Sequence, residues 1–273
     1  MALLVLAGAS SAGSAVTRIP HRIVSLSPTA TESLFAVGAG GQVIAVDDQS
    51  DYPKTTPRTK LSGFTPNVEA IASYKPDLVV LSFDTGGVVA SLHKLKIRVL
   101  VQPAAQDLTQ AYGQILELGG VTGHARKAKA VVAGMKQSIA RVLARAPHDS
   151  SLKVFHELEP DLYSATSKTF IGKIYALFGL TNIADAADST NSGYPKLSNE
   201  YIIGSNPSLI VLADTRCCGQ TPQTVSARPG WNTISAVRNR AIARIDDSIA
   251  SRWGPRVVNF VRAVASALRI ARS

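Results

Sequence analysis

The sequence predicts an α/β protein made of two Rossmann-like lobes with parallel sheets, joined by one long rigid α-helix. Three features indicate this fold: strand-like runs alternate with helical stretches, one helix–strand unit occurs twice, and a long amphipathic helix separates the two copies. The 273 residues are enough for two such lobes. Hydrophobic residues make up 45% of the chain and charged residues 18%, which is the balance of a folded protein.

Short runs of β-branched and aliphatic residues recur along the chain. Runs without polar alternation are typical of strands buried on both faces, as in parallel sheets covered by helices. We expect strands at residues 23–26, 43–46, 78–81, 97–101, 154–155, 209–212 and 241–245.

One helix–strand unit occurs twice. Residues 69–81 and 200–212 share Glu, Ile, Pro, Leu, Val and Leu at identical spacing. In each copy a proline ends a short helix and a buried strand follows. The two copies lie much further apart than the roughly 20–50-residue period of a solenoid, so the repeat indicates two similar lobes.

A long helix is expected between the two copies. Apolar residues recur at helical spacing from His124 to Ala146, and the segment from Pro147 ends the pattern. The apolar stripe consists of Ala128, Val131, Val132, Met135, Ile139, Val142 and Leu143. We therefore divide the chain into an N-terminal remnant (1–20), a first lobe (21–122), an interlobe helix (123–147) and a second lobe (148–273). Because one helix resists bending, we expect the lobes to close only slightly.

The first residues are apolar and then rich in small residues, like the end of an export signal. Leu6-Ala7-Gly8 also resembles part of a bacterial lipoprotein box. Ala9 stands where the lipidated cysteine would be, so we expect no lipid anchor at this residue. An exported chain would work outside the cytoplasm, in the periplasm or at the cell surface.

The chain is basic, with 29 Lys and Arg against 19 Asp and Glu and a formal net charge of +10. Such a charge suits nucleic acid, an anionic surface or solubility alone. The basic residues are scattered along the sequence without a dense run, so we expect no nucleic-acid partner. No stretch is apolar over the length that a transmembrane helix requires.

Four segments resemble the periplasmic binding proteins that serve ABC importers of cobalamin, ferric siderophores and haem. They are residues 22–32, 50–53, 69–81 and 231–239, and the similarity extends over nearly all of the chain from Arg22 to Ala271. The resemblance implies the substrate-binding subunit of such an importer, acting as a monomer and not as an enzyme. It implies no cofactor or metal site of the protein's own, because the small-molecule ligand is itself a metal chelate.

The resemblance also implies how the protein meets its partner, the ABC permease in the membrane. In this family each lobe presents one exposed glutamate to arginines of the permease, and the matching positions here are Glu69 and Glu200. Two separated carboxylate–guanidinium pairs would fix the orientation of docking. Both residues also stand near helix starts, where the helix dipole favours acids without any partner.

The ligand is expected in the cleft between the lobes, where the loops of parallel sheets meet. The cobalamin binders of this family line the cleft with aromatic residues and few charges. The resemblance therefore implies ligand-binding candidates on the corresponding loops, which are Tyr52, Phe64, Phe83, Phe170, Tyr194, Asp247, Arg252 and Trp253. Flat rings suit a flat macrocycle, so we expect a cobalamin-like corrinoid. Asp247 could accept from its amides, whereas Arg252 could meet a carboxylate-bearing ferric siderophore, which is the alternative ligand.

Haem is a further alternative and would need an axial Tyr or His. Phe64 stands where this family often has the tyrosine, which leaves Tyr194 or His156. The five histidines show no metal-ligand spacing. The alternative from another class is an α/β enzyme that uses His156 with the nearby acids Glu157, Glu159 and Asp161. The sequence offers no nucleophile or oxyanion site to accompany such a base.

Cys217 and Cys218 are adjacent and are the two cysteines of the chain. An intramolecular disulfide between them would be vicinal, with Cα atoms about 3.8 Å apart instead of the usual 4.4–6.8 Å or so. In an oxidising compartment we expect this disulfide to form. Two thiols without a role are the alternative.

Overall fold

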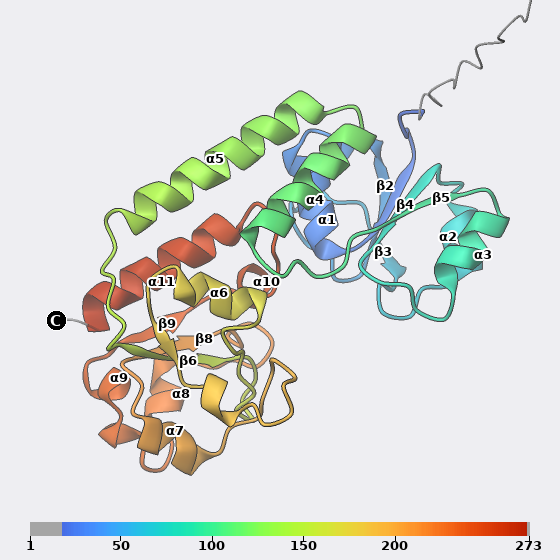
Figure 1. The fold of residues 1–273 in the computed structure, drawn as a ribbon. Coiled ribbons are helices and arrows are strands. Elements are labelled where there is room, and N and C mark those ends of the chain that lie inside the picture. Colours follow the sequence, from blue (N-terminus) through green and yellow to red (C-terminus); the bar gives the residue numbers. More distant parts are fainter. Residues whose placement is uncertain (1–17, 272–273) are drawn as a thin grey trace, which may run out of the picture.

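Two parallel sheets, one in each lobe, organise the molecule (Figure 1). The computed structural model describes residues 18–271. Within this range the sheets hold five and four strands, and every strand pair is parallel. The predicted fold class, two parallel-sheet α/β lobes, is therefore confirmed.

The first lobe has the strand order β3-β2-β1-β4-β5. Its strands are β1 (Ile23–Leu26), β2 (Val43–Asp47), β3 (Arg58–Leu61), β4 (Leu78–Leu81) and β5 (Arg98–Val101). Its helices are α1 (Pro28–Ala36), the 3₁₀ turn η1 (Gly40–Gln42), α2 (Val68–Ser73), α3 (Val88–Lys94) and α4 (Leu108–Val121). The central strands β1 and β4 are buried at every residue, which explains their uninterrupted apolar sequences.

The second lobe has the strand order β7-β6-β8-β9. Its strands are β6 (Lys153–Glu157), β7 (Thr181–Asn182), β8 (Leu209–Leu212) and β9 (Ile242–Arg244). Its α-helices are α6 (Phe170–Ala176), α7 (Asn199–Ser205), α8 (Pro222–Ser226), α9 (Ser235–Arg238), α10 (Asp247–Ala250) and α11 (Val257–Ala271). Two 3₁₀ turns, η2 (Asp185–Ala187) and η3 (Trp231–Thr233), complete it.

The sequence pattern missed two edge strands. β3 lies at one edge of its sheet and reads Arg-Thr-Lys-Leu, with Leu61 its one buried residue. β7 has two residues. Neither strand is buried on both faces, so neither carries the apolar run on which the strand prediction depended.

The sequence repeat corresponds to the same local structure in each lobe. Asn67 caps α2 by accepting from the backbone N–H of Ala70, and Ser198 caps α7 by accepting from that of Tyr201. β4 and β8, which follow these helices, are central in their sheets and fully buried.

One long helix, α5 (Ala125–Leu143), connects the lobes (Figure 1). It ends four residues before the predicted boundary at residue 147, and it packs against α4 of the first lobe and α11 of the second. The core that it covers includes Ile23 and Leu78 from one sheet and Val154 and Leu209 from the other. The lobes therefore share one continuous apolar core in addition to the connecting helix.

Polar contacts add a second connection between the lobes. Glu32 of α1 is buried and accepts from Arg252 of the second lobe at 3.0 Å and from Arg256 Nε at 2.9 Å. Arg252 also pairs with Asp51 of the first lobe at 2.9 Å. Among residues 18–271, none of the helices has the length and apolarity needed to cross a membrane.

Candidate functional site

A large cavity lies between the lobes, at the carboxyl ends of the strands of both sheets. Its volume is about 880 Å³. The loops after β1, β2, β3, β4 and β5 line it from the first lobe, and the loops after β8 and β9 line it from the second. Loops at the carboxyl ends of parallel strands are the usual place for ligand binding in open α/β sheets.

Two phenylalanines form an exposed aromatic wall on the first-lobe side. Phe64 is 67% exposed and Phe83 is 42% exposed, and their ring centroids lie 6.1 Å apart. A side chain at Gly63 would place its Cβ 2.7 Å from the Leu26 carbonyl oxygen, so the loop that carries Phe64 needs glycine for this close approach. Large apolar rings left exposed in a cleft mark a binding surface.

Trp253 supplies an aromatic ring from the second-lobe side. It lines the cavity, is half-buried, and donates from Nε1 to Gln114 Oε1 of α4 at 2.8 Å. This bond fixes the indole against the first lobe. The cavity is therefore lined by aromatic rings from both lobes, as the sequence indicated for these three positions.

Phe170 and Tyr194 line an adjoining cavity of about 340 Å³. Trp253, Ala104 and Ser251 line both cavities, so the two lie next to each other in the cleft and share part of their wall. Phe170 is largely buried, while Tyr194 is 48% exposed. Burial raises the pKa of the Tyr194 phenol, which keeps its proton at neutral pH.

Asp247 lines the main cavity, but its carboxylate already accepts hydrogen bonds from the protein backbone. It accepts backbone N–H groups from Thr215 at 2.9 Å, Arg216 at 3.0 Å and Cys217 at 2.7 Å. Burial acts to raise the pKa of Asp247, but these donors outweigh it and lower the pKa. Asp247 therefore holds the loop after β8 in place.

Arg252 also lines the cavity with its charge already paired. Its guanidinium contacts the carboxylates of Glu32 and Asp51 and donates to the Gln49 carbonyl oxygen at 2.9 Å. Its side chain is 13% exposed. A guanidinium held in this way cannot turn to a siderophore carboxylate without breaking its ion pairs with Glu32 and Asp51, and local sequence could not show these pairs.

Tyr52 does not line either part of the cleft. Its ring lies 4.1 Å from the Arg256 guanidinium and borders a separate pocket with residues of α1, α5 and α11. The loop after β2 turns it away from the cavity that Asp47 and Gln49 of the same segment line.

Cys217 and Cys218 are exposed and their thiols are free in this structure, and the vicinal disulfide in an oxidising compartment stays a prediction. The Cys217 N–H is bound by Asp247, which fixes the turn. Adjacent residues in an ordinary trans chain are too close for a relaxed disulfide. Burial, Cys218 and Asp247 together raise the pKa of the Cys217 thiol to about 12, so it remains a protonated thiol at neutral pH.

His156 is fully buried in the core of the second lobe. The structure therefore contradicts the enzyme and haem alternatives that relied on this histidine. It lies on β6, in the middle of its sheet, with no exposed surface. Its Nδ1 is 2.5 Å from the Tyr175 hydroxyl, and the Phe260 ring covers it. Burial lowers its pKa to about 3. It can reach neither a substrate nor a haem iron.

Several lining residues were missed from the sequence. Asp47 is buried beside the cavity, and burial raises its pKa. Ser82 donates to Ser27 at 2.8 Å, which joins the loops after β4 and β1. The signal that could have found them is their place directly after predicted strands, where small polar residues also line a cleft.

Glu69 and Glu200 are both exposed and both occupy the second position of their capped helices. Within residues 18–271, neither carboxylate forms an ion pair. Figure 1 places α2 and α7 in different lobes, so the two glutamates lie on separate parts of one molecule.

Two known proteins resemble the chain in sequence over most of its length. It is 31% identical over 270 residues to the uncharacterized ABC transporter substrate-binding lipoprotein YvrC of Bacillus subtilis, covering 95% of this chain and 83% of that protein. It is 28% identical over 257 residues to a cobalamin-binding protein of Halobacterium salinarum, covering 91% and 69%.

A solved structure also resembles the chain. A possible iron-binding periplasmic solute-binding protein of Staphylococcus epidermidis superposes with a TM-score of 0.77 at 26% identity, covering 92% of this chain and 99% of that one. The model of the periplasmic binding protein family matches residues 23–249. The chain therefore belongs to the periplasmic binding protein family, as a substrate-binding protein of the ABC importer type.

Proposed function

We propose that this protein captures a corrinoid of the cobalamin type in the interlobe cavity and delivers it to an ABC permease. The observation that carries the proposal is the lining of the cavity. Three aromatic rings face a volume of about 880 Å³, near the upper end of the roughly 300–1,000 Å³ of ordinary ligand pockets. A large, flat and mostly apolar ligand suits this space.

The residues around the cavity favour a metal-containing ligand that needs no axial metal ligand from the protein. The residues that line the main cavity include no histidine and no tyrosine. Haem iron usually takes an axial His or Tyr from the protein. A corrinoid carries cobalt already held by its ring, so it needs area and hydrogen bonds rather than an iron ligand. The cobalamin-binding relative from Halobacterium salinarum supports the same ligand class.

A ferric siderophore is the second candidate, and haem is the third. The iron-binding title of the Staphylococcus epidermidis structure supports iron ligands. Against an anionic siderophore, Arg252 is engaged by two carboxylates. Tyr194, in the adjoining cavity, would be the iron ligand for haem, and its raised pKa opposes the phenolate that binds iron.

We place the protein outside the cytoplasm, as its family suggests. We further propose that Glu69 and Glu200 are the contacts for the permease. Both are exposed, unpaired within the described chain and equivalent in the two lobes. A carboxylate on each lobe would meet an arginine of the permease, and two such contacts would fix the orientation of delivery.

Titration calorimetry with cyanocobalamin, haemin and a panel of ferric siderophores tests the ligand. We expect one-to-one binding of cyanocobalamin. Phe64→Ala and Phe83→Ala should each weaken it roughly tenfold, because each removes a stacking ring. Tyr163→Ala is the matched control, since Tyr163 is 38% exposed but lies outside both cavities. Saturable binding of haemin or a siderophore with no response to cyanocobalamin would reject the corrinoid.

Uptake measurements in cells that depend on this protein test the docking contacts. Glu69→Ala combined with Glu200→Ala should abolish uptake and leave the affinity for the cleft ligand unchanged. Asp48→Ala combined with Glu159→Ala is the control, because it removes two other exposed acids. Normal uptake by the Glu69/Glu200 variant would show that the permease is contacted elsewhere.

A further inference from the structure

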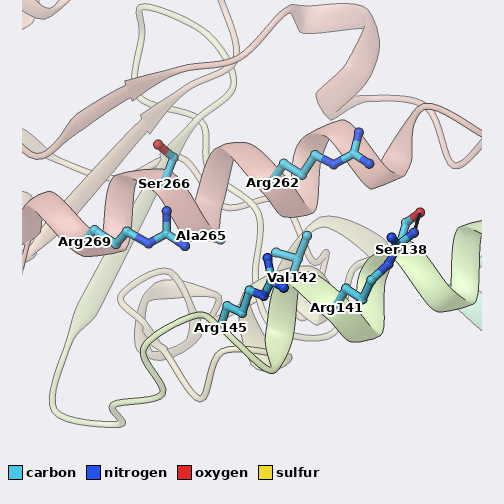
Figure 2. Close-up of a pocket in the computed structure, with 8 residues that line it drawn as sticks. All are labelled: Ser138, Arg141, Val142, Arg145, Arg262, Ala265, Ser266 and Arg269. Atoms are coloured by element: carbon cyan, nitrogen blue, oxygen red, sulfur yellow. Dashed lines mark hydrogen bonds between the residues drawn. The ribbon is translucent and has the colours of Figure 1, made fainter.

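A groove lined by four arginines lies between α5 and α11, away from the ligand cavity. Figure 2 shows Arg141 and Arg145 extending from α5 beside Arg262 and Arg269 on α11. The groove has a volume of about 370 Å³ and shares no lining residue with either part of the cleft. The other lining residues are Ser138, Val142, Ala265 and Ser266.

The excess positive charge of the chain lies in two sequence segments, one containing α5 and the other containing α11. Residues 125–148 and 248–273 contain eleven Lys and Arg and no Asp or Glu. The rest of the sequence has 18 basic and 19 acidic side chains, so it is close to neutral. The basic residues look scattered along the chain because the two segments are about 100 residues apart, but the fold packs α5 against α11. Two basic segments that are distant in the sequence therefore lie side by side in the fold.

The four arginine side chains are exposed. Arg262 donates to Asn259 Oδ1 at 3.1 Å, and Arg141 makes only long contacts with Gln137 and Ser138. None of the four forms an ion pair within residues 18–271. Arg252 and Arg256, on the same acid-free segment, are instead paired with Glu32.

Like charges gathered in one groove repel one another, and a bound anion removes this repulsion. The guanidinium fork matches the oxygens of phosphate, which it binds through two parallel hydrogen bonds. The hydroxyls of Ser138 and Ser266 lie in the same lining and can add donors. The groove thus offers donors and positive charge and contains no acid to oppose an anion.

We propose that the α5–α11 groove is a second binding site, for a polyvalent phosphate-bearing anion. The phosphate could be carried by a soluble ester or by the headgroup of an anionic lipid, and both share the same oxygens. This site lies beyond the function of the cleft and does not depend on which ligand the cleft takes. Attraction by the whole face would be long-ranged and would weaken as salt is added.

The test compares one groove variant with one control of equal charge. The groove variant is Arg141→Gln, Arg145→Gln, Arg262→Gln and Arg269→Gln, since glutamine keeps a good helix propensity. The control removes four exposed lysines elsewhere, by the changes Lys54→Gln, Lys60→Gln, Lys94→Gln and Lys173→Gln. Calorimetry measures binding of inorganic tripolyphosphate. Sedimentation measures binding to phosphatidylcholine vesicles with and without phosphatidylglycerol.

We expect the parent and the control to bind tripolyphosphate, phosphatidylglycerol vesicles or both, and the groove variant to bind on the order of 100-fold more weakly. Binding in the tripolyphosphate arm alone assigns a soluble phosphate, and binding in the vesicle arm alone assigns a lipid headgroup. No binding in either arm, or an equal loss in the control, overturns the proposal.

Two checks separate this result from folding and from the cleft. If the fourfold variant does not fold, Arg145→Gln with Arg269→Gln changes one residue on each helix and should still lose most of the binding. The affinity for the cleft ligand should be the same in all variants, so failure of the corrinoid assignment would leave this test intact.

Discussion

Two buried acid–arginine clusters, one between the lobes and one inside the second lobe, differ in their balance of charge. Between the lobes, Glu32 faces two arginines, Arg252 and Arg256. Inside the second lobe, Arg228 faces two carboxylates, because Glu157 binds both of its terminal nitrogens at 2.6 Å while Asp214 lies beside them.

The two clusters differ in how many hydrogen bonds the carboxylate oxygens accept. Glu32 accepts bonds at both oxygens. Asp214 is fully buried, and neither of its oxygens has a hydrogen-bond partner within the described chain. Burial and the neighbouring Glu157 raise the pKa of Asp214 to about 7. The acid between the lobes is therefore fully paired, whereas the cluster inside the second lobe retains an acid that resists ionisation.

Removing Glu32, the buried acid of the interlobe cluster, should have the largest effect on stability. Glu32→Gln leaves Arg252 and Arg256 buried with less negative charge, and we expect a loss of about 3–5 kcal/mol in the free energy of unfolding. Urea denaturation at neutral pH measures it. A loss below 1 kcal/mol would show that water or Asp51 compensates the arginines.

Replacing Asp214, the second acid of the cluster inside the second lobe, should instead stabilise the protein above neutral pH. The pKa of Asp214 is raised from 3.8 to about 7 on folding, so its contribution is fully present below about pH 4 and is lost as the pH rises through 7. Asp214→Asn cannot ionise, and its amide could donate to Glu157. We expect it to be more stable than the parent by about 1–3 kcal/mol at pH 8.

The dependence on pH is the control for this prediction. The difference between Asp214→Asn and the parent should shrink as the pH falls toward 4, where both side chains are neutral. Paired unfolding curves at several pH values measure it. A difference that stays constant with pH would mean that Asp214 does not titrate in this range.

An exposed pair of the same chemistry should have the smallest effect. Lys196 and Asp161 lie 2.9 Å apart with both side chains half exposed. Asp161→Asn should cost less than about 1 kcal/mol, because water screens the pair and hydrates the remaining lysine. Thermal unfolding of this variant beside Glu32→Gln compares the two environments directly. Equal losses would mean that burial does not account for the strength of the interlobe cluster.

Much of the fold could be predicted because the central strands are buried on both faces. The runs at 23–26, 78–81 and 209–212 coincide with β1, β4 and β8, since full burial leaves a continuous apolar sequence. The edge strands β3 and β7 carry no such signal. The long helix was recognised from its apolar stripe, but the role of α11 in the shared core needed the tertiary structure.

The candidate site was predictable in position and less so in detail. Phe64, Phe83, Trp253, Arg252 and Asp247 do line the cavity, because each follows a strand at its carboxyl end. Local sequence could not show that Arg252 and Asp247 are held by partners, which come from residues about 30 to 220 positions away. Nor could it show that Tyr52 turns toward Arg256. Whether these residues bind the ligand stays a prediction.

The apolar core that runs through both lobes has a consequence for how the chain unfolds. Separating the lobes would expose the buried faces of α5 and α11, so neither lobe has a complete interior of its own. We therefore expect the two lobes to melt together, as one cooperative transition in a calorimeter, although the architecture suggests two domains. A fragment that stops at residue 122 should remain unfolded.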